Sequence, residues 1–279
     1  MKLISFIIPL YGLSIGNNTV YFDVLLHSIS IASIPLHGHY ELIIINDDKE
    51  RITEETIKML CSRYKLENYL IYHENDINKG QAYSRNVGAS LASGKYLHFI
   101  DQDDYISDDF YASYMQQQGN ADFYIALPYF DKDGIIKQAY TEYLKNAYKN
   151  ARYFSDLWYL LLSNIVYSPG QLIMSKSAYD SVGGFPVLEK KGADDFALFY
   201  KLVFSGKNYK VSFIPESSFY YRIHSQQNSK LSSTNDSACE FLSQVKPIGI
   251  KQNVVKIQKT RKWAGYLGKL FYITFFKRA

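Results

Sequence analysis

The sequence of 279 residues is poor in cysteine and has no long apolar run. Its two cysteines, Cys61 and Cys239, stand far apart without metal-ligand spacing, which argues against a disulfide framework or a zinc site and favours the reducing cytosol. No run approaches the roughly 18 apolar residues that a membrane-spanning helix needs. The sequence also lacks G-x-G-x-x-G and the P-loop motif G-x-x-x-x-G-K, which argues against a dinucleotide-binding protein or a P-loop enzyme.

The charge of the chain is small in total but uneven. A formal net charge of +4 gives no reason to expect a nucleic acid partner. From Lys246 onward Asp and Glu are absent, and residues 261–278 combine basic side chains with aromatic and aliphatic ones. This profile is typical of a segment that rests on an anionic membrane surface, but it equally fits a C-terminal helix packed on the domain or on a partner subunit.

Apolar runs alternate with stretches of helical periodicity in the first hundred residues. We expect strands at 3–8, 41–45, 70–72 and 95–101 and helices at 20–34, 53–64 and 81–93, with Pro9 ending the first strand. This order predicts a Rossmann-like, mostly parallel central sheet with helices on both faces. Later, strands are expected at 123–127 and 211–214 and helices at 154–162, 179–182 and 194–205, with loops over most of 131–171.

The most informative stretch is the fourth predicted strand, which runs into Asp101-Gln102-Asp103-Asp104. A strand that delivers aspartates at its carboxyl end places them at the edge where open α/β sheets bind ligands. Because carboxylates this close repel one another, a hard divalent cation such as Mg²⁺ or Mn²⁺ would neutralise the cluster. We therefore expect a metal–diphosphate site here, and the alternative is a solvated acidic turn.

Two other strand ends and one helix start carry groups that suit a nucleotide. Tyr11, just after the first strand, can stack on a base, although a local packing role explains it equally well. Asp47, at the tip of the second strand, can accept a hydrogen bond from a base or a ribose hydroxyl. Lys79 and Arg85 lie at the start of the third predicted helix, and a helix N-terminus with basic residues suits an anion.

The order of these motifs resembles glycosyltransferase family 2. The resemblance covers about residues 3–228 and is carried by Ile7-Ile8-Pro9-Leu10-Tyr11, Ile45-Asn46-Asp47, Asn78-Lys79-Gly80, Ser84-Arg85-Asn86, Ser93-Gly94-Lys95-Tyr96, Asp101-Gln102-Asp103-Asp104, Val182-Gly183-Gly184-Phe185, Gly192-Ala193-Asp194-Asp195 and Tyr220-Tyr221-Arg222-Ile223-His224. The ordered set is far more specific than any one of its members. It implies the GT-A fold, a nucleotide-diphosphate-sugar donor, Mn²⁺ or Mg²⁺, and inversion of the anomeric centre.

The resemblance also implies roles for individual residues. The donor would be bound by Pro9, Tyr11, Asp47, Lys79, Arg85, Asp101, Gln102, Asp103 and Arg222. Within this set Tyr11 and Asp47 would hold the base, and Asp101 would contact the ribose or the diphosphate. Asp103 would be the direct metal ligand, with His224 as a second ligand.

Asp195 would be the general base that deprotonates the acceptor hydroxyl, with Asp194 as the alternative. Acids at a helix start also simply favour the helix dipole. The sequence departs from the family pattern in three places: Gly12 replaces the usual Asn, the turn 46–49 differs, and Asp194 replaces the usual Glu. These departures bear on how the base is positioned and on which acid is catalytic.

The sequence thus predicts a cytosolic, metal-dependent, inverting glycosyltransferase of bacterial surface polysaccharide synthesis, using a UDP-sugar and a saccharide or lipid-linked acceptor. We expect a GT-A domain at 1–228, with a nucleotide-binding half (1–105) and an acceptor-binding half (106–228), and a C-terminal helical extension at 229–279. Peripheral contact of residues 261–278 with the cytoplasmic face of the membrane and homo-oligomerisation are left open.

Two other functions compete with this one. A non-catalytic nucleotide-sugar-binding subunit would keep the nucleotide pocket without transferring sugar. A haloacid-dehalogenase-like phosphatase would use Asp101 and Asp103, but its aspartates usually follow the first strand, and Tyr105 stands where Thr or Val is expected.

Overall fold

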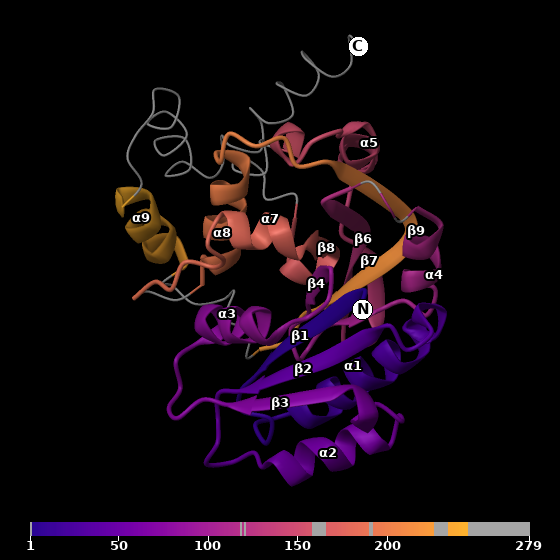
Figure 1. The fold of residues 1–279 in the computed structure, drawn as a ribbon, viewed down its shortest axis with the longest axis vertical. Coiled ribbons are helices and arrows are strands. Elements are labelled where there is room, and N and C mark those ends of the chain that lie inside the picture. The colour runs from indigo at the N-terminus through magenta and orange to yellow at the C-terminus, as the bar shows by residue number, and fades with distance from the viewer. Residues whose placement is uncertain are drawn as a thin grey trace.

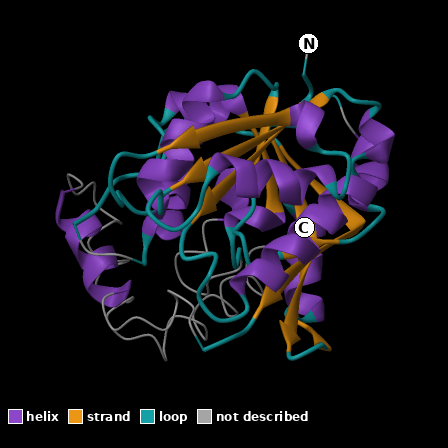
Figure 2. Cartoon of the chain, turned by 90° about the horizontal axis from the view of Figure 1, so that it is seen from below, coloured by secondary structure: helices purple, strands orange, loops and turns teal. Residues whose placement is uncertain are grey.

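The computed structural model describes residues 2–117, 119, 121–157, 166–189, 192–225 and 234–244. Within them, nine strands form one mixed sheet, and helices cover both of its faces (Figures 1 and 2). The strands are β1 (Ile4–Leu10), β2 (Tyr40–Asn46), β3 (Leu70–Glu74), β4 (Tyr96–Phe99), β5 (Tyr105–Ile106), β6 (Phe123–Lys132), β7 (Ile135–Gln138), β8 (Leu172–Ser175) and β9 (Val211–Arg222). The predicted α/β fold class is confirmed.

The order of the strands separates a parallel part from a mixed part. The order is β3-β2-β1-β4-β8-β6-β9-β5, with β7 paired to β6 outside this path. Strands β1 to β4 are parallel to one another, as the alternating pattern of the first hundred residues predicts. Strand β8 is antiparallel to both of its neighbours, β9 is parallel to β6, and β5 is antiparallel to β9.

The helices divide between the two faces of the sheet. They are α1 (Asn18–Ala32), α2 (Glu54–Ser62), α3 (Gln81–Leu91), α4 (Phe110–Gln117), α5 (Glu142–Asn150), α7 (Lys176–Ser181), α8 (Asp194–Val203) and α9 (Thr234–Gln244). Helices α1, α2 and α4 pack on one face against Phe6 and Ile8 of β1. Helices α3, α5, α7 and α8 pack on the other face, where Ile7 of β1 and Ile45 of β2 lie. Residues alternate between faces because successive side chains of a strand point in opposite directions.

The first strand does not end where the sequence predicts. Strand β1 continues through Pro9, which pairs with Ile45, as far as Leu10. Leu10 bonds toward β2, where its carbonyl accepts from the Asp47 N–H at 2.8 Å, whereas Ile7 bonds toward β4. Successive residues of a strand direct their backbone N–H and C=O groups toward opposite neighbouring strands, so Pro9 faces β4, as Ile7 does. The N–H that proline lacks would lie just beyond the last hydrogen bond between β1 and β4, so no bond of the sheet is lost.

Two elements occupy the stretch where loops are expected, so the prediction for 131–171 is wrong at both. All four residues of β7 are exposed, so the strand has no apolar alternation to reveal it. Helix α5 is capped by Thr141, whose side chain accepts from the Leu144 N–H at 3.3 Å, and it buries one apolar face. That cap and its helical spacing are a readable signal. The helix expected at 154–162 is a short 3-10 helix at Phe154–Leu157, and the rest lies outside the described residues.

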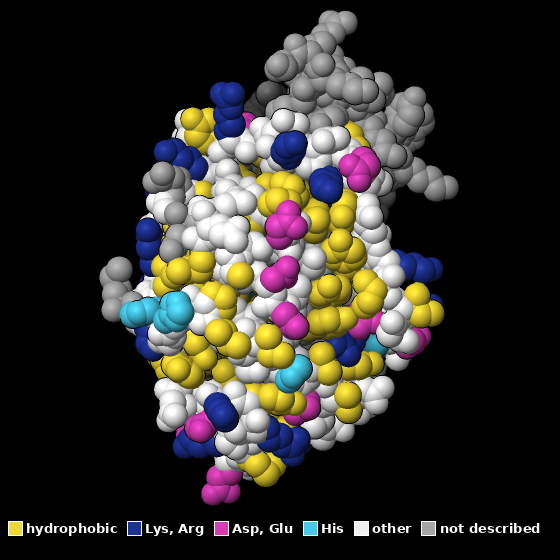
Figure 3. Space-filling model, turned by 90° about the vertical axis from the view of Figure 1, so that its right-hand side faces the viewer, with side chains coloured by type: hydrophobic (Ala, Val, Ile, Leu, Met, Phe, Trp, Pro, Cys, Tyr) yellow, Lys and Arg dark blue, Asp and Glu magenta, His cyan; other side chains and the backbone are white. Residues whose placement is uncertain are grey.

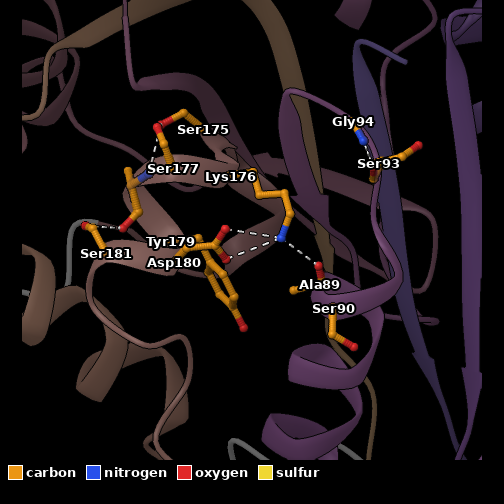
Figure 4. Close-up of polar contacts among 12 residues, drawn as sticks. Ala89, Ser90, Ser93, Gly94, Ser175, Lys176, Ser177, Tyr179, Asp180 and Ser181 are labelled. Atoms are coloured by element: carbon orange, nitrogen blue, oxygen red, sulfur yellow. Dashed lines mark hydrogen bonds and ion pairs between the residues drawn. The ribbon is translucent and has the colours of Figure 1, made fainter. Parts of the chain in front are cut away.

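Helix α3 enters the site by its first turn and is held at its other end by α7. The Lys176 ammonium donates to the Ala89 carbonyl at 3.0 Å and pairs with Asp180 at 3.2 Å (Figure 4). A cation near the last carbonyls of a helix also interacts favourably with the helix dipole. The contact joins the predicted nucleotide-binding and acceptor-binding halves.

The described part of the predicted C-terminal extension packs onto the rest of the domain. Phe241 of α9 is buried against Phe196 and Tyr200 of α8, with ring centroids 6.4 and 5.5 Å away. Residues 261–278, predicted to contact membrane or protein, lie outside the described residues. None of the helices in the described ranges has the length and apolar character needed to cross a membrane.

The surface at the β9 end of the molecule carries mixed charge. Figure 3 shows acidic, basic and apolar side chains interspersed on this face, with a row of acidic ones through its middle. No basic stripe of the kind that binds nucleic acid phosphates is visible on the described part of that face.

A buried histidine generates a testable stability prediction. The His98 Nε2 faces the Gly170 carbonyl at 2.7 Å and Nδ1 contacts the Tyr111 hydroxyl, so a neutral ring with its proton on Nε2 satisfies both partners. Burial lowers the pKa of His98 to about 4. The stability that this neutral ring contributes is therefore present above about pH 6.5 and is lost as the pH falls toward 4.

Between pH 7.5 and pH 4.5, we expect the free energy of unfolding in urea to fall by about 2.5 kcal/mol more in the wild type than in His98→Gln, because the variant has no imidazole to protonate. Comparing the two proteins cancels the other titrating groups. Identical losses in both would contradict a buried neutral His98.

Candidate active site

The acidic and basic residues predicted from the sequence meet at the carboxyl edge of β1, β2 and β4. The starts of α3 and α8 point to the same edge, so residues from both predicted halves lie together there. Pro9 is the exception, because it is buried inside β1 and contributes no polar side chain. The described edge therefore brings the predicted metal ligand, donor contacts and base into one region.

Arg85 lies at the centre of this edge and bridges two of the predicted acids. Its Nη2 donates to Asp101 Oδ1 at 2.6 Å and its Nη1 donates to Asp195 Oδ1 at 3.0 Å. Only 1% of the Arg85 side chain is exposed. Burial alone would lower the pKa of Arg85, but the carboxylates of Asp101, Asp195 and Asp194 raise it above its usual range. The guanidinium is therefore a permanent positive charge inside the protein.

Asp195 combines an enclosed position with access to the solvent side of the cleft. Burial raises the pKa of Asp195 to about 7, Arg85 opposes this rise, and Asp101 and Asp194 add to it. About a third of the side chain (35%) is still exposed, so a small group can reach it. A carboxylate that titrates near neutrality and remains accessible has the properties of a general base.

Asp103 lies against His224 from the far end of the described domain. The His224 Nε2 is 2.7 Å from Asp103 Oδ2, and both side chains are mostly buried, with 11% and 22% exposed. The two residues stand 121 positions apart in the sequence. The predicted metal ligands are thus brought together, as the resemblance implies.

Arg222 holds the end of β9 against this pair. Its guanidinium lies between the rings of Tyr21 and Tyr105, 4.4 and 5.0 Å from their centroids. Its Nε donates to the Asp103 carbonyl at 2.9 Å, and its backbone N–H donates to Asp104 at 3.0 Å. Cation–π contacts on both sides fix the position of Arg222, and through it the segment that carries His224.

Asp104 is a buried acid that sequence reasoning left without a role. Burial, together with Asp103 and Asp101, raises the pKa of Asp104 well above its usual range. One of its oxygens, Oδ2, has no hydrogen-bond partner in the described structure. The Arg222 backbone N–H and guanidinium oppose this rise, so Asp104 is the acid of the cluster whose charge burial disfavours most.

Asp47 holds the loop that leads into α3. Its Oδ1 accepts from the Lys79 N–H and the Asn75 amide, and its Oδ2 accepts from the Gly80 N–H, all at 2.7–2.9 Å. Only 4% of Asp47 is exposed. Its predicted contact with the base stays a prediction, and the described geometry adds a role in setting the start of α3.

Tyr11 and Gln102 join the ends of β1 and β4. The Tyr11 N–H donates to the Gln102 side-chain oxygen, and the Gln102 amide donates back to the Tyr11 carbonyl, both at 2.8 Å. Tyr11 is 47% exposed, which leaves its side chain available for stacking. Gln102 is therefore a clamp on the backbone of Tyr11 as well as a member of the acidic motif.

The departure at Gly12 has a simple geometric reason. Gly12 has φ +61°, in the left-handed region that glycine and asparagine tolerate best. Its N–H donates to Asp48 Oδ2 at 3.0 Å. The chain thus keeps the conformation that the usual Asn would also allow, and the altered 46–49 turn supplies Asp48 to hold it.

Sequence reasoning missed three side chains that organise the edge. Gln81 donates to Asp101 Oδ1 at 2.6 Å, and Tyr21 packs on His224 with ring centroids 5.2 Å apart. Asn86 exchanges two hydrogen bonds with the Phe185 backbone, tying α3 to the Gly183-Gly184 turn. Lys79, by contrast, is exposed and lies over the Tyr83 ring. Asn86 belongs to the Ser84-Arg85-Asn86 motif and Gln81 directly follows Asn78-Lys79-Gly80, whereas Tyr21 lies in none of the motifs.

The donor set at Asp103 and His224 fits a divalent cation in part. Two ligands each about 2.1 Å from an ion lie about 3 Å apart, close to the spacing of this carboxylate and imidazole. Among the described residues no group of three or more His, Cys, Asp or Glu side chains is arranged for a metal. The remaining ligands would therefore come from phosphate oxygens and water, which is usual for Mg²⁺ in phosphate-binding sites.

The sequence matches the pattern of the family described as "Glycosyltransferase like family 2" over residues 5–246. The match begins in β1 and continues past α9. It therefore includes every element that contributes a residue to the edge described above.

Individual relatives agree with this match. A β-1,3-glucosyltransferase of Escherichia coli, WfaP, is 24% identical over 80% of this chain and 78% of its own length. GgaB, a minor teichoic acid biosynthesis protein of Bacillus subtilis, is 26% identical over 47% of this chain, which covers only 14% of GgaB. The structure of Staphylococcus aureus TarS with UDP-GlcNAc superimposes with a TM-score of 0.66 at 17% identity, covering 99% of this chain and 73% of that one. The last match establishes the GT-A fold.

The role of Asp47 in holding the loop before α3 can be tested by Asp47→Asn. An amide nitrogen cannot accept from the backbone N–H groups of Lys79 and Gly80, so a buried donor loses its partner. We expect a loss of about 2–4 kcal/mol in the free energy of unfolding measured in urea. The exposed neighbour Asp76 provides the matched control, and Asp76→Asn should stay within about 0.5 kcal/mol of the wild type. Equal stability of both variants would show that Asp47 does not hold the loop.

Proposed function

This chain belongs to glycosyltransferase-like family 2, and on that premise we propose that it is a metal-dependent, inverting glycosyltransferase. The proposed reaction moves a sugar from a nucleoside diphosphate to a hydroxyl of a glycan or a lipid-linked saccharide. The observation that supports the proposal is that Asp101, the proposed donor contact, and Asp195, the proposed base, both bind the same buried side chain, Arg85.

The donor end of the site is assigned to the edge of β1, β2 and β4. The exposed ring of Tyr11, fixed by Gln102, would stack on the base. Asp101 would accept from the ribose or lie beside the diphosphate, and Asp103 with His224 would hold the cation. When bound there, the cation supplies Lewis-acid stabilisation of the charge on the departing diphosphate. Arg222 keeps this corner in place through Asp103, so its predicted contact with phosphate is an additional proposal.

The chemical step is assigned to Asp195. Its Oδ1 holds the Arg85 bond, so Oδ2 is the oxygen proposed to accept the acceptor proton. As the acceptor oxygen bonds to the anomeric carbon, the bond from that carbon to the diphosphate breaks, and its electron pair leaves with the nucleotide. Because attack and departure occur on opposite faces of the sugar, the anomeric configuration is inverted. Asp194, at the same helix start, acts on Asp195 electrostatically and is the second candidate for the base.

The substrates proposed follow the names of the relatives. WfaP is described as acting with UDP-Glc on a diphosphoundecaprenol-linked sugar, and TarS was solved with UDP-GlcNAc. We therefore assign a UDP-sugar donor and an acceptor from bacterial surface polysaccharide synthesis, made at the cytoplasmic face of the membrane. A binding subunit without transferase activity would not need Asp195 to titrate near neutrality in an accessible position.

The role of Asp195 is tested by Asp195→Asn. We expect turnover of UDP-glucose or UDP-N-acetylglucosamine with Mn²⁺ to fall by about 10² to 10⁴ in kcat, because the amide cannot accept the proton. UDP affinity, measured by calorimetry, should stay within about threefold of the wild type. In the wild type, kcat should rise with pH through about pH 7, since the base must be ionised.

The same experiment separates the competing functions. Asp133→Asn, an exposed acid between β6 and β7, is the matched control and should behave as the wild type. If the wild type binds UDP but turns over neither donor, the result favours the binding-subunit hypothesis over the enzyme hypothesis. Full activity in Asp195→Asn would remove this residue from the mechanism.

The cation site is tested by binding rather than by activity. We expect Asp103→Asn and His224→Ala each to weaken Mn²⁺ binding by at least about 10-fold in the presence of UDP, because each removes one of the two protein ligands. The free Mn²⁺ signal in electron paramagnetic resonance measures this directly. Unchanged Mn²⁺ affinity in both variants would show that the cation, if used, binds elsewhere.

A further inference from the structure

The buried position of Arg85 calls for a role other than direct contact with a ligand. With 1% of its side chain exposed, Arg85 is among the largest fully buried side chains of the protein. Its guanidinium also lies 5.0 Å from the Phe185 ring, which closes one side. An anion approaching from solvent therefore meets Asp101 and Asp195 before it meets the arginine.

The surroundings hold Arg85 in place from two directions. Its neighbour Asn86 bonds to both backbone groups of Phe185, so the ring that covers the guanidinium is fixed to α3 itself. At the far end of α3, Lys176 binds the Ala89 carbonyl (Figure 4). The helix that carries Arg85 is thus held to the acceptor-binding half at its middle and near its C-terminal end.

The two terminal nitrogens of Arg85 bind two carboxylates that have different proposed roles. Nη2 binds Asp101, which follows β4. Nη1 binds Asp195, which lies in the first turn of α8, 110 residues from Arg85 in the sequence. A planar guanidinium can bind both only while both carboxylates keep their positions. A lysine, with a single charged nitrogen, could not reproduce this fork.

We propose that Arg85 is a positioning residue that holds Asp101 and Asp195 as one unit, so that a donor bound at Asp101 is sensed at Asp195. The inference rests on the proposed function of the two acids. The Arg85 guanidinium interacts with both carboxylates, so a ligand that draws Asp101 away from it changes the strength of the interaction between Arg85 and Asp195. The base would thereby respond to the presence of the donor.

The charged groups around Asp195 give the direction of each effect. Those that face it are Arg85 from α3, Asp101 after β4, and Asp194 on its own helix. Arg85 lowers the pKa of Asp195, whereas Asp101 and Asp194 raise it. Removing Arg85 should therefore raise the pKa of Asp195, and neutralising Asp101 should lower it.

The experiment is a direct titration of Asp195 by carbon-13 NMR of the aspartate carboxyl groups, assigned with Asp195→Asn. In Arg85→Met we expect the midpoint to move up by about one pH unit or more, and in Asp101→Asn to move down by about half a unit or more. Asp133→Asn, an exposed acid between β6 and β7, is the matched control and should leave the midpoint unchanged. If Arg85→Met does not fold, Asp101→Asn still decides the direction.

The coupling itself is tested by adding UDP with Mg²⁺. In the wild type the Asp195 midpoint should move when the nucleotide binds, and in Asp101→Asn it should move by much less. Shifts of the same sign in both variants, no shift in either, or an equal response to UDP in both proteins would overturn the proposal. The titration needs no turnover, so a protein that transfers no sugar would refute the proposed function without deciding this result.

Discussion

The ion pairs of one buried arginine organise the site. Burying a guanidinium is costly unless its charge is matched, and here two carboxylates from distant parts of the chain match it. Because an unpaired partner would leave a buried charge uncompensated, Arg85, Asp101 and Asp195 stabilise one another's positions. The geometry of the proposed donor contact and base therefore follows from a requirement of charge balance in the interior.

A second contact across the chain completes the site. His224 reaches Asp103 over 121 residues, and Arg222, held between two tyrosine rings, fixes the segment that brings it there. Both this contact and the Arg85 fork join a residue of the first predicted half to one of the second. The site exists only where the parallel sheet and the later mixed strands meet, which explains why the fold needs both halves to make one active edge.

Much of the fold could be predicted because its signals are local. Strands β1 to β4 are buried apolar runs, and α2 begins at a Thr53 cap that the sequence shows. The acids at strand ends follow from the same rule of sheet edges. Strand β7 could not be found this way, because all its side chains are exposed. Strand β1 continues past Pro9 because that residue faces β4, where its missing N–H costs no hydrogen bond of the sheet.

The individual roles at the site depended on tertiary contacts. Arg85 was placed near an anion because it starts a helix, but nothing in its neighbourhood in the sequence points to Asp195. Asp47 was expected at the base, and its bonds to the Lys79 and Gly80 backbone emerge only when the loop folds over it. The pKa of Asp195 likewise depends on burial by the folded chain.

The most direct test of this account is a crystal structure of the protein with Mn²⁺ and an unreactive UDP-sugar analogue. We expect the diphosphate beside Asp103 and His224, the anomeric carbon turned toward Asp195, and Arg85 still bonded to both Asp101 and Asp195. A donor bound away from this edge, or an Asp195 that has left Arg85 and faces away from the sugar, would contradict it.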